Sequence, residues 1–369
     1  MEKKQRYLAL DVLRGMTIAL MILVNNPGSW SHIYAPLEHS HWHGCTPTDL
    51  VFPFFLFVVG VSMFFSFSKY GNTLNKESLM KIGKRTFLIF AIGLFLNSFP
   101  QWTADFSTLR IMGVLQRIAL AYGIGSVIVL AVNRKYLPFV GGGILLLYWA
   151  LLIAFGGSDP FSLEGNVTTG IDLAIFGESH LYRGFGIPFD PEGLFSTIPA
   201  IVTVLIGYLI GSVIKETEKK QVPVRLIIFG MAAISAGLVW GLVFPINKPI
   251  WSSSYVLYSA GWASLVLASL IWIIDLKGFS GWTSFFVVFG MNPLFIYALS
   301  GIWARIIGRM IHFTGNNGEI MSASAWSYQQ IFQPLAGNIN GSLLFAISHV
   351  LFFWLIGFVL YKRSVFIKV

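Results

Sequence analysis

Long runs of apolar residues dominate this sequence and constrain its fold more than any other feature. A helix that crosses a membrane needs about 20 mostly apolar residues. We expect ten such helices, at residues 8–26, 50–68, 86–99, 111–132, 138–155, 194–214, 224–244, 255–274, 283–311 and 342–361. The third is short in apolar residues, and the ninth is long enough to be kinked or broken.

Composition supports the same fold class. Only 11% of the 369 residues are charged, whereas a soluble domain carries about 25%. The sequence therefore predicts an all-α polytopic integral membrane protein and excludes a soluble enzyme or a nucleic-acid binder. We expect a single transmembrane domain over residues 1–369, with no separate soluble domain and with long outer segments at 27–48, 156–193 and 312–341.

The basic residues are divided unevenly between the two sides of the expected bundle. Most of the 25 Lys and Arg residues fall at the termini and in alternate connecting segments: Lys3, Lys4, Arg6, Lys69, Lys76, Lys81, Lys84, Arg85, Arg134, Lys135, Lys215, Lys219, Lys220, Arg225, Lys277, Lys362, Arg363 and Lys368. The opposite side carries only Arg110, Arg183 and Lys248. Since cytoplasmic loops are enriched in Lys and Arg, both termini are predicted to be cytoplasmic, and the net charge of +9 reflects topology.

Polar residues inside the first expected helix are candidates for function. A charge at the centre of a membrane helix costs about 2.5–3.5 kcal/mol on insertion scales. At 100° per residue, Asp11, Arg14 and Asn25 share one helix face. They either line a site inside the bundle, or Asp11 and Arg14 simply neutralise each other.

The fourth expected helix carries a second pair of cations. Arg110 and Arg117 lie seven residues apart, about two helical turns, with Gly113 between them. Two cations on one stripe separated by a small residue favour a narrow groove for an anionic ligand with a thin arm. The alternative is that Arg110 caps the outer interface and Arg117 pairs with a carboxylate from another helix.

Histidines gather in the first outer segment. His32, His39, His41 and His43 lie there, and Asp49 opens the next expected helix. Imidazoles could hold a metal ion, could have no role, or could supply a general base near neutral pH. Cys45 is the single cysteine, so neither a disulfide nor a Cys-based metal site is expected.

Several ordered motifs resemble those of one family. They are Arg14-Gly15 through Asn25, the segment with His39, Trp42, Gly44 and Thr46, Asp49-Leu50-Val51-Phe52-Pro53, Leu109-Arg110-Ile111-x-Gly113-Val114-Leu115-Gln116-Arg117, Asp190-Pro191-Glu192-Gly193, Pro245-x-Asn247-Lys248-x-x-Trp251-Ser252-x-Ser254-Tyr255, and Gly290-Met291-Asn292-Pro293. Together they resemble the transmembrane acetyltransferases typified by lysosomal heparan-α-glucosaminide N-acetyltransferase, with NagX-like bacterial members. The resemblance covers about residues 6–363. The outer histidine segment is slightly longer here and adds His41 and His43 as rivals of His39.

The resemblance implies transfer of an acetyl group from cytoplasmic acetyl-CoA to an amino sugar of the glucosamine type on the periplasmic side. The family's active-site histidine precedes the loop tryptophan by three residues, which selects His39. Its partner asparagine matches Asn25, and Asp49 is the expected orienting carboxylate. The donor-binding set is Arg14, Arg110, Gln116, Arg117 and Asn292, and the expected sugar-side residues are Asp190, Trp251 and Tyr255.

Other functional classes stay open at the level of the sequence. An envelope glycan O-acyltransferase could use the same cationic groove and histidine, and a sugar transporter could use the charged helices as a path. In the acetyltransferase reading, the partners are acetyl-CoA as donor substrate, an amino-sugar acceptor and the lipid bilayer of a bacterial inner membrane. No metal and no nucleic acid are expected, and a homodimer is left open.

The charge asymmetry generates a topology prediction. A reporter fused after Lys219 should behave as cytoplasmic, and a reporter inserted within 156–193 should behave as periplasmic, because Lys and Arg are retained inside. Paired alkaline phosphatase and fluorescent-protein fusions at both points measure this. A periplasmic reporter at Lys219 would overturn the assignment.

Overall fold

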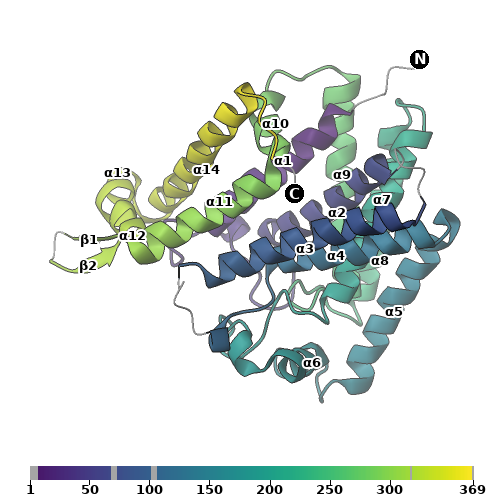
Figure 1. The fold of residues 1–369 in the computed structure, drawn as a ribbon, viewed down its shortest axis with the longest axis horizontal. Coiled ribbons are helices and arrows are strands. Elements are labelled where there is room, and N and C mark those ends of the chain that lie inside the picture. The colour runs from purple at the N-terminus through teal and green to yellow at the C-terminus, as the bar shows by residue number, and fades with distance from the viewer. Residues whose placement is uncertain (1–6, 68–72, 101–105, 316–317, 368–369) are drawn as a thin grey trace.

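Helices make up nearly all the regular structure of the computed structural model, which describes residues 7–67, 73–100, 106–315 and 318–367 (Figure 1). The basic residues Lys3, Lys4, Arg6, Lys69 and Lys368, used above for topology, lie outside these ranges. The long helices are α1 (Leu8–Asn25), α2 (Pro47–Phe67), α3 (Lys76–Ser98), α4 (Val114–Ala131), α5 (Leu137–Phe155), α7 (Thr197–Glu216), α8 (Val222–Gly241), α9 (Ser253–Leu270) and α14 (Asn338–Lys362).

Shorter elements complete the chain. They are α6 (Val167–Phe176), α10 (Thr283–Met291), α11 (Pro293–Arg305), α12 (Ala323–Ser327), α13 (Gln333–Ala336), and an antiparallel hairpin of β1 (His312–Thr314) and β2 (Ile320–Ser322) that pairs Phe313 with Met321. The hairpin, α12 and α13 lie within the expected outer segment 312–341, and α6 lies within the expected outer segment 156–193.

The helices fit the predicted membrane class. Within the described ranges, eight helices are long and apolar enough to cross a membrane, and nine qualify if α10 and α11 form one span. These two helices meet at an angle of 83°, so the ninth expected helix is broken, as its length indicated. The helix α3 covers the third expected span and has 23 residues, but its first turns are charged and it does not meet the apolar criterion. The count of ten spans stays a prediction.

Different segments of the chain meet at the two ends of the helical bundle. At one end, here called the loop end, the backbone N–H of Gly44 donates to the Ile246 carbonyl, and that of Ile111 donates to the His180 carbonyl. At the other end, here called the basic end, the Asp275 carboxylate accepts the N–H groups of Leu8 and Ala9 at 3.0 and 3.1 Å. Asp275 thus caps the free first turn of α1.

The helix α2 is the central element of the bundle. It is apolar all round and largely buried, which is typical of a helix enclosed by others. Its closest neighbour is α7. The two backbones touch through glycines, because a Cβ at Gly60 would lie 2.0 Å from the Val204 carbonyl oxygen and one at Gly207 would lie 2.1 Å from that of Phe57. Small residues permit this approach between membrane helices.

Gly207→Ala should therefore destabilise the fold, since the added methyl group meets backbone that cannot move aside. We expect a loss of about 3 kcal/mol, at the upper end of overpacking effects. Gly143→Ala in α5 is the matched control, because nothing lies within 4 Å of the added Cβ. Thermal unfolding of both variants in detergent measures the difference, and equal midpoints would contradict the close α2–α7 contact.

Candidate active site

Asp49 organises the loop end of α2. It lies in the first turn of this helix, where a carboxylate is favoured by the helix dipole. Its Oδ2 accepts the backbone N–H groups of Ser40 and Thr46, both at 3.0 Å, and the Thr46 hydroxyl at 3.1 Å. Its Oδ1 lies 2.7 Å from Nδ1 of His39. The carboxylate is buried with 1% exposure, whereas the His39 side chain is 45% exposed.

Lys248 completes this cluster from the other half of the chain. Its Nζ lies 3.3 Å from Oδ1 of Asp49 and 3.0 Å from Nδ1 of His39. An ionised carboxylate only accepts hydrogen bonds and an ammonium only donates them. The 2.7 Å contact with Asp49 therefore assigns the proton to Nδ1 of His39, so that Lys248 donates to Asp49 and Nε2 of the ring is left to accept a proton.

A strained turn positions Lys248. The next residues fold back so that Trp251 N donates to the Lys248 carbonyl at 2.9 Å, and Asn247 accepts the N–H of Ile250 through its side chain. Trp251 has a φ of 50°, a conformation rare for large side chains. Since Trp251 is fully buried and its indole N–H donates to Thr203 at 3.2 Å, tertiary contacts hold this turn in place.

The other polar residues of this segment are less well placed. His43 lies 3.3 Å from the Asn247 side-chain nitrogen, and partial burial lowers the pKa of its imidazole. His41 is exposed and has no hydrogen bond to another described residue. Asn25 is the last residue of α1 and is exposed, and no hydrogen bond joins it to His39 in the described part of the chain. The structure thus brings together His39 and Asp49 of the expected catalytic set.

The expected sugar-side residues Trp251 and Tyr255 lie beneath this cluster. Both are fully buried, and their rings meet edge to face at 5.3 Å between centroids. The Tyr255 hydroxyl donates to the backbone carbonyl of Asp49 at 2.5 Å. Both side chains therefore support the site from below, and neither is open to a sugar.

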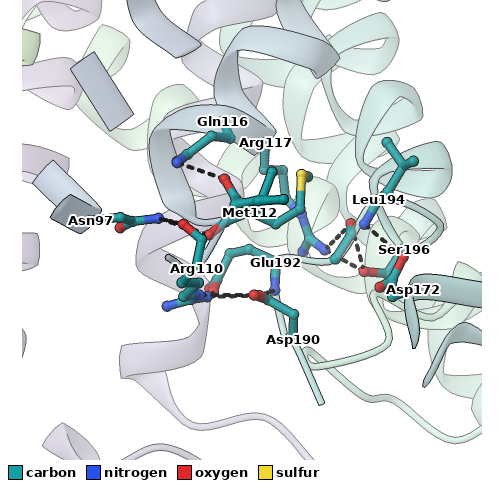
Figure 2. A network of polar contacts seen from close by, with 12 residues as sticks. Asn97, Arg110, Met112, Gln116, Arg117, Asp172, Asp190, Glu192, Leu194 and Ser196 are labelled. Carbon is teal, nitrogen blue, oxygen red and sulfur yellow. Dashed lines mark hydrogen bonds and ion pairs between the residues drawn. The ribbon is translucent and has the colours of Figure 1, made fainter. Parts of the chain in front are cut away.

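A second polar network joins the segment before α4 and the start of α4 to the segment before α7 (Figure 2). Arg110 donates to Asp190 through Nε at 2.8 Å and Nη2 at 2.7 Å, and to Glu192 at 2.7 Å. Its guanidinium also stacks over the Tyr182 ring at 4.7 Å. Burial opposes the charge of Arg110, but the two carboxylates outweigh it and raise its pKa. Asp190, expected near the sugar, is buried in this ion pair.

The position of Arg110 corrects the expected cationic stripe. The helix α4 begins at Val114, so Arg110 lies in the preceding segment and not on the same helix face as Arg117. Asn97 holds this segment by donating to the carbonyls of Arg110 and Met112 at 2.9 and 3.0 Å. Gln116 donates to the Ile111 carbonyl at 2.9 Å. Arg110 and Arg117 therefore do not form one stripe on a single helix.

Arg117 is fully buried within α4. It donates to the Gly193 carbonyl at 3.3 Å and to the Ser196 hydroxyl, and its guanidinium stacks over the Trp251 ring at 4.9 Å. Its Nε and Nη1 have no hydrogen-bond partner among the described residues. Arg117 thus joins the two polar networks through Trp251, without the direct carboxylate partner of the alternative hypothesis.

A cavity of about 340 Å³ opens towards the basic end. Arg14 lines it and donates to Ser62 of α2 at 2.9 Å, while its Nη1 lies 3.5 Å from Asp11. Arg85 also lines it and stacks over the Tyr122 ring at 4.7 Å. The remaining wall is formed by α2, α3, α4, the α10–α11 corner and Ile367. Of the expected donor-binding residues, only Arg14 lines this cavity.

A second cavity of about 240 Å³ continues this space outward. It shares Arg85 and Tyr122 with the first cavity and adds Lys81 near the start of α3. The Nε of Arg85 is buried without a hydrogen-bond partner in the described ranges. From the sequence, Arg85 served only as a topology residue, because it lies at the end of the basic segment 69–85 and directly before an apolar run.

Asn292 lies at the break between α10 and α11 and is fully buried. Its side-chain amide is hydrogen-bonded to the backbone of Val365 and Ile367, and Asn292 is not among the residues that line the cavity.

Within the described ranges, no three His, Cys, Asp or Glu side chains are grouped so that they could hold a metal ion.

Comparison with known proteins identifies relatives of this chain. A family model described as heparan-alpha-glucosaminide N-acetyltransferase, catalytic, matches residues 6–238. The human and mouse proteins named heparan-alpha-glucosaminide N-acetyltransferase are each 26% identical to it over 423 aligned residues, which cover 99% of this chain. The chain spans 60% of the length of these relatives. The matched family region contains His39 and Asp49 but ends before Lys248.

Asp172 gives the second network a dependence on pH. It lies in α6 and accepts the N–H groups of Leu194 and Phe195 at 3.1 and 3.3 Å. Burial raises the pKa of its carboxyl from 3.8 to about 6. The folded chain therefore holds this proton more tightly than the unfolded chain, and stability should fall as pH rises from about 4 to 6.

Asp172→Asn should remove this slope, because the amide oxygen still accepts both N–H groups but carries no charge. We expect the variant to be more stable than the wild type at pH 7.5, by at most about 3 kcal/mol. Thermal midpoints in detergent from pH 4.5 to 7.5 measure the effect, with Glu164→Gln, an exposed carboxylate of the same segment, as control. Parallel pH profiles for Asp172→Asn and wild type would contradict the assignment.

Proposed function

Because this chain belongs to the family of heparan-alpha-glucosaminide N-acetyltransferase catalytic domains, we propose that it is a transmembrane acetyltransferase. In this proposal, acetyl-CoA binds from the cytoplasm at the basic end, and the acetyl group passes to the amine of a glucosamine-type sugar at the periplasmic loop end. The observation that carries the proposal is that the cluster of His39, Asp49 and Lys248 lies at one end of α2 and that a cation-lined cavity lies further along the same helix.

The two cavities at the basic end suit an anionic donor with a long arm. Arg85 and Lys81 would bind the phosphates by charge-assisted hydrogen bonds, and the deeper cavity would take the thinner arm beside Arg14. With a rise of 1.5 Å per residue, the cavity-lining Phe55 and Ser62 of α2 lie about 9 and 20 Å along the helix axis from Asp49. An extended arm can bridge that interval, whereas a compact donor cannot.

The cluster at the loop end suits proton removal from an amine. An ammonium group has no lone pair, so the sugar nitrogen must lose a proton before or while it attacks. Nε2 of His39 would accept that proton, with Nδ1–H fixed on Asp49. The amine lone pair then forms the new C–N bond at the thioester carbonyl and the C–S bond breaks. The second proton that the nitrogen loses passes to the departing sulfur, so that coenzyme A leaves as the thiol.

Lys248 would act in this scheme through Asp49. By donating to Oδ1, it fixes the carboxylate oxygen that orients the His39 ring. The ammonium also offsets the negative charge of the Asp49 carboxylate, whose side chain is 1% exposed, since a buried unpaired charge is costly.

The proposal also concerns two other residues of the loop end, Asn25 and Cys45. Asn25 lies at the loop end of α1, and its exposed amide remains the proposed donor to the oxyanion of the tetrahedral intermediate. Cys45 precedes α2, and burial raises the pKa of its thiol to about 12. Since only the thiolate is a good nucleophile, Cys45 does not carry the acetyl group. Transfer without an acetyl-cysteine is therefore part of the proposal.

His39→Ala should lower the rate of acetyl transfer about 10²–10⁴-fold, as expected for loss of a general base. His41→Ala is the matched control and should keep near-wild-type activity, because His41 is exposed and pairs with no carboxylate in the described part of the chain. The assay is mass-spectrometric detection of acetylated product from acetyl-CoA and a panel of amino sugars, with the corresponding hydroxyl sugars alongside.

Folding of both variants is checked by thermal unfolding in detergent. An active His39→Ala variant with an inactive His41→Ala variant would redirect the catalytic role. Product formed only from hydroxyl acceptors would replace the N-acetyltransferase proposal with an O-acyltransferase.

A further inference from the structure

The chain turns back into the bundle after α14. This helix ends at Lys362, and Ser364 takes a φ of 54°. The N–H of Val365 donates to the Leu360 carbonyl at 2.9 Å and that of Ser364 to the Tyr361 carbonyl at 3.0 Å. This pattern is the cap in which a left-handed residue reverses the chain at a helix end. In Figure 1 the last segment runs from α14 along α10 towards the corner with α11.

Asn292 holds the segment that follows α14 through two hydrogen bonds. Its Nδ2 donates to the Val365 carbonyl at 3.0 Å, and its Oδ1 accepts the N–H of Ile367 at 2.7 Å. One side chain thus pairs with alternate residues of an extended strand, as a neighbouring strand would. Because successive side chains of an extended strand point to opposite sides, Ile367 and Phe366 face in different directions.

Ile367 lies between two cavities. It lines the 340 Å³ cavity that contains Arg14, and it also lines an apolar cavity of about 270 Å³ between α3 and α11. Ile89 and Leu294 border both cavities as well. Of these three residues, Ile367 alone comes from a segment outside the helices.

We propose that Ile367 forms one wall of the donor cavity and that Asn292 is the positioning residue that holds this wall in place. The inference rests on the proposed function, in which this cavity takes the arm of a coenzyme A thioester. A fully buried amide is costly unless its donors and acceptors are paired. At the broken helix, Asn292 pairs its amide with the returning segment, and this fixes Ile367 at the cavity.

The wall gives the donor arm its apolar contact on the side that faces α11. Without it, the donor cavity would merge with the apolar cavity, and the arm would be less confined. Loss of the wall should therefore weaken donor binding and leave the chemistry at His39 and the binding of the acceptor unchanged.

The test compares two tryptophan substitutions in the full chain, purified in detergent, with coenzyme A as the titrated ligand. Ile367→Trp fills the cavity and should weaken coenzyme A binding about tenfold, equivalent to 1.4 kcal/mol. Phe366→Trp is the matched control and should bind as the wild type does, since Phe366 lines neither cavity. Both positions are partly exposed, 38% and 42% respectively, so both variants should fold.

Asn292→Ala provides the second readout. We expect a higher KM for acetyl-CoA with kcat and the acceptor KM unchanged, a split that general destabilisation would not produce. Coenzyme A binding by Ile367→Trp equal to that of the wild type would overturn the wall while leaving the proposed function intact. Failure of the wild type to bind coenzyme A would overturn the proposed donor site itself.

Discussion

Inside a membrane, buried polar groups have only other protein groups as partners, and this requirement shapes every site in the molecule. An unpaired charge or amide in an apolar medium costs several kcal/mol. Arg110 is therefore matched by Asp190 and Glu192, and Asp49 is matched by Lys248 and His39. The pairs that Arg110 and Lys248 make join segments far apart in the sequence, so the polar contacts also determine which loops meet at the loop end.

The fold class and the family could be predicted from the sequence because both depend on short stretches of consecutive residues. Apolar runs of about 20 residues predict membrane helices directly, and the excess length of 283–311 indicated the break that Asn292 occupies. Motifs around His39 and Asp49 indicated the family that the comparisons identify. The pairing of these two residues could also be predicted, because only ten positions separate them.

The rest of the site depends on contacts that local spacing does not contain. Lys248 reaches Asp49 from 199 positions away, and Arg110, in the segment before α4, pairs with carboxylates about 80 positions later. Trp251 and Tyr255 have the residue types of a sugar site, yet both are buried beneath it. Of the cations that line the 340 Å³ cavity, the sequence predicted a binding role for Arg14 and not for Arg85, because the two come from helices that the sequence treats separately.

The burial of Cys45 has a consequence for the redox chemistry of the molecule. On the proposed topology, this single cysteine faces an oxidising compartment, where an unpaired thiol tends to form disulfides with other chains. Thiol–disulfide exchange needs the thiolate, and a thiol with a pKa of about 12 provides almost none at neutral pH. The loop that carries His39 can therefore keep a cysteine beside Asp49 without linking one copy of the protein to another.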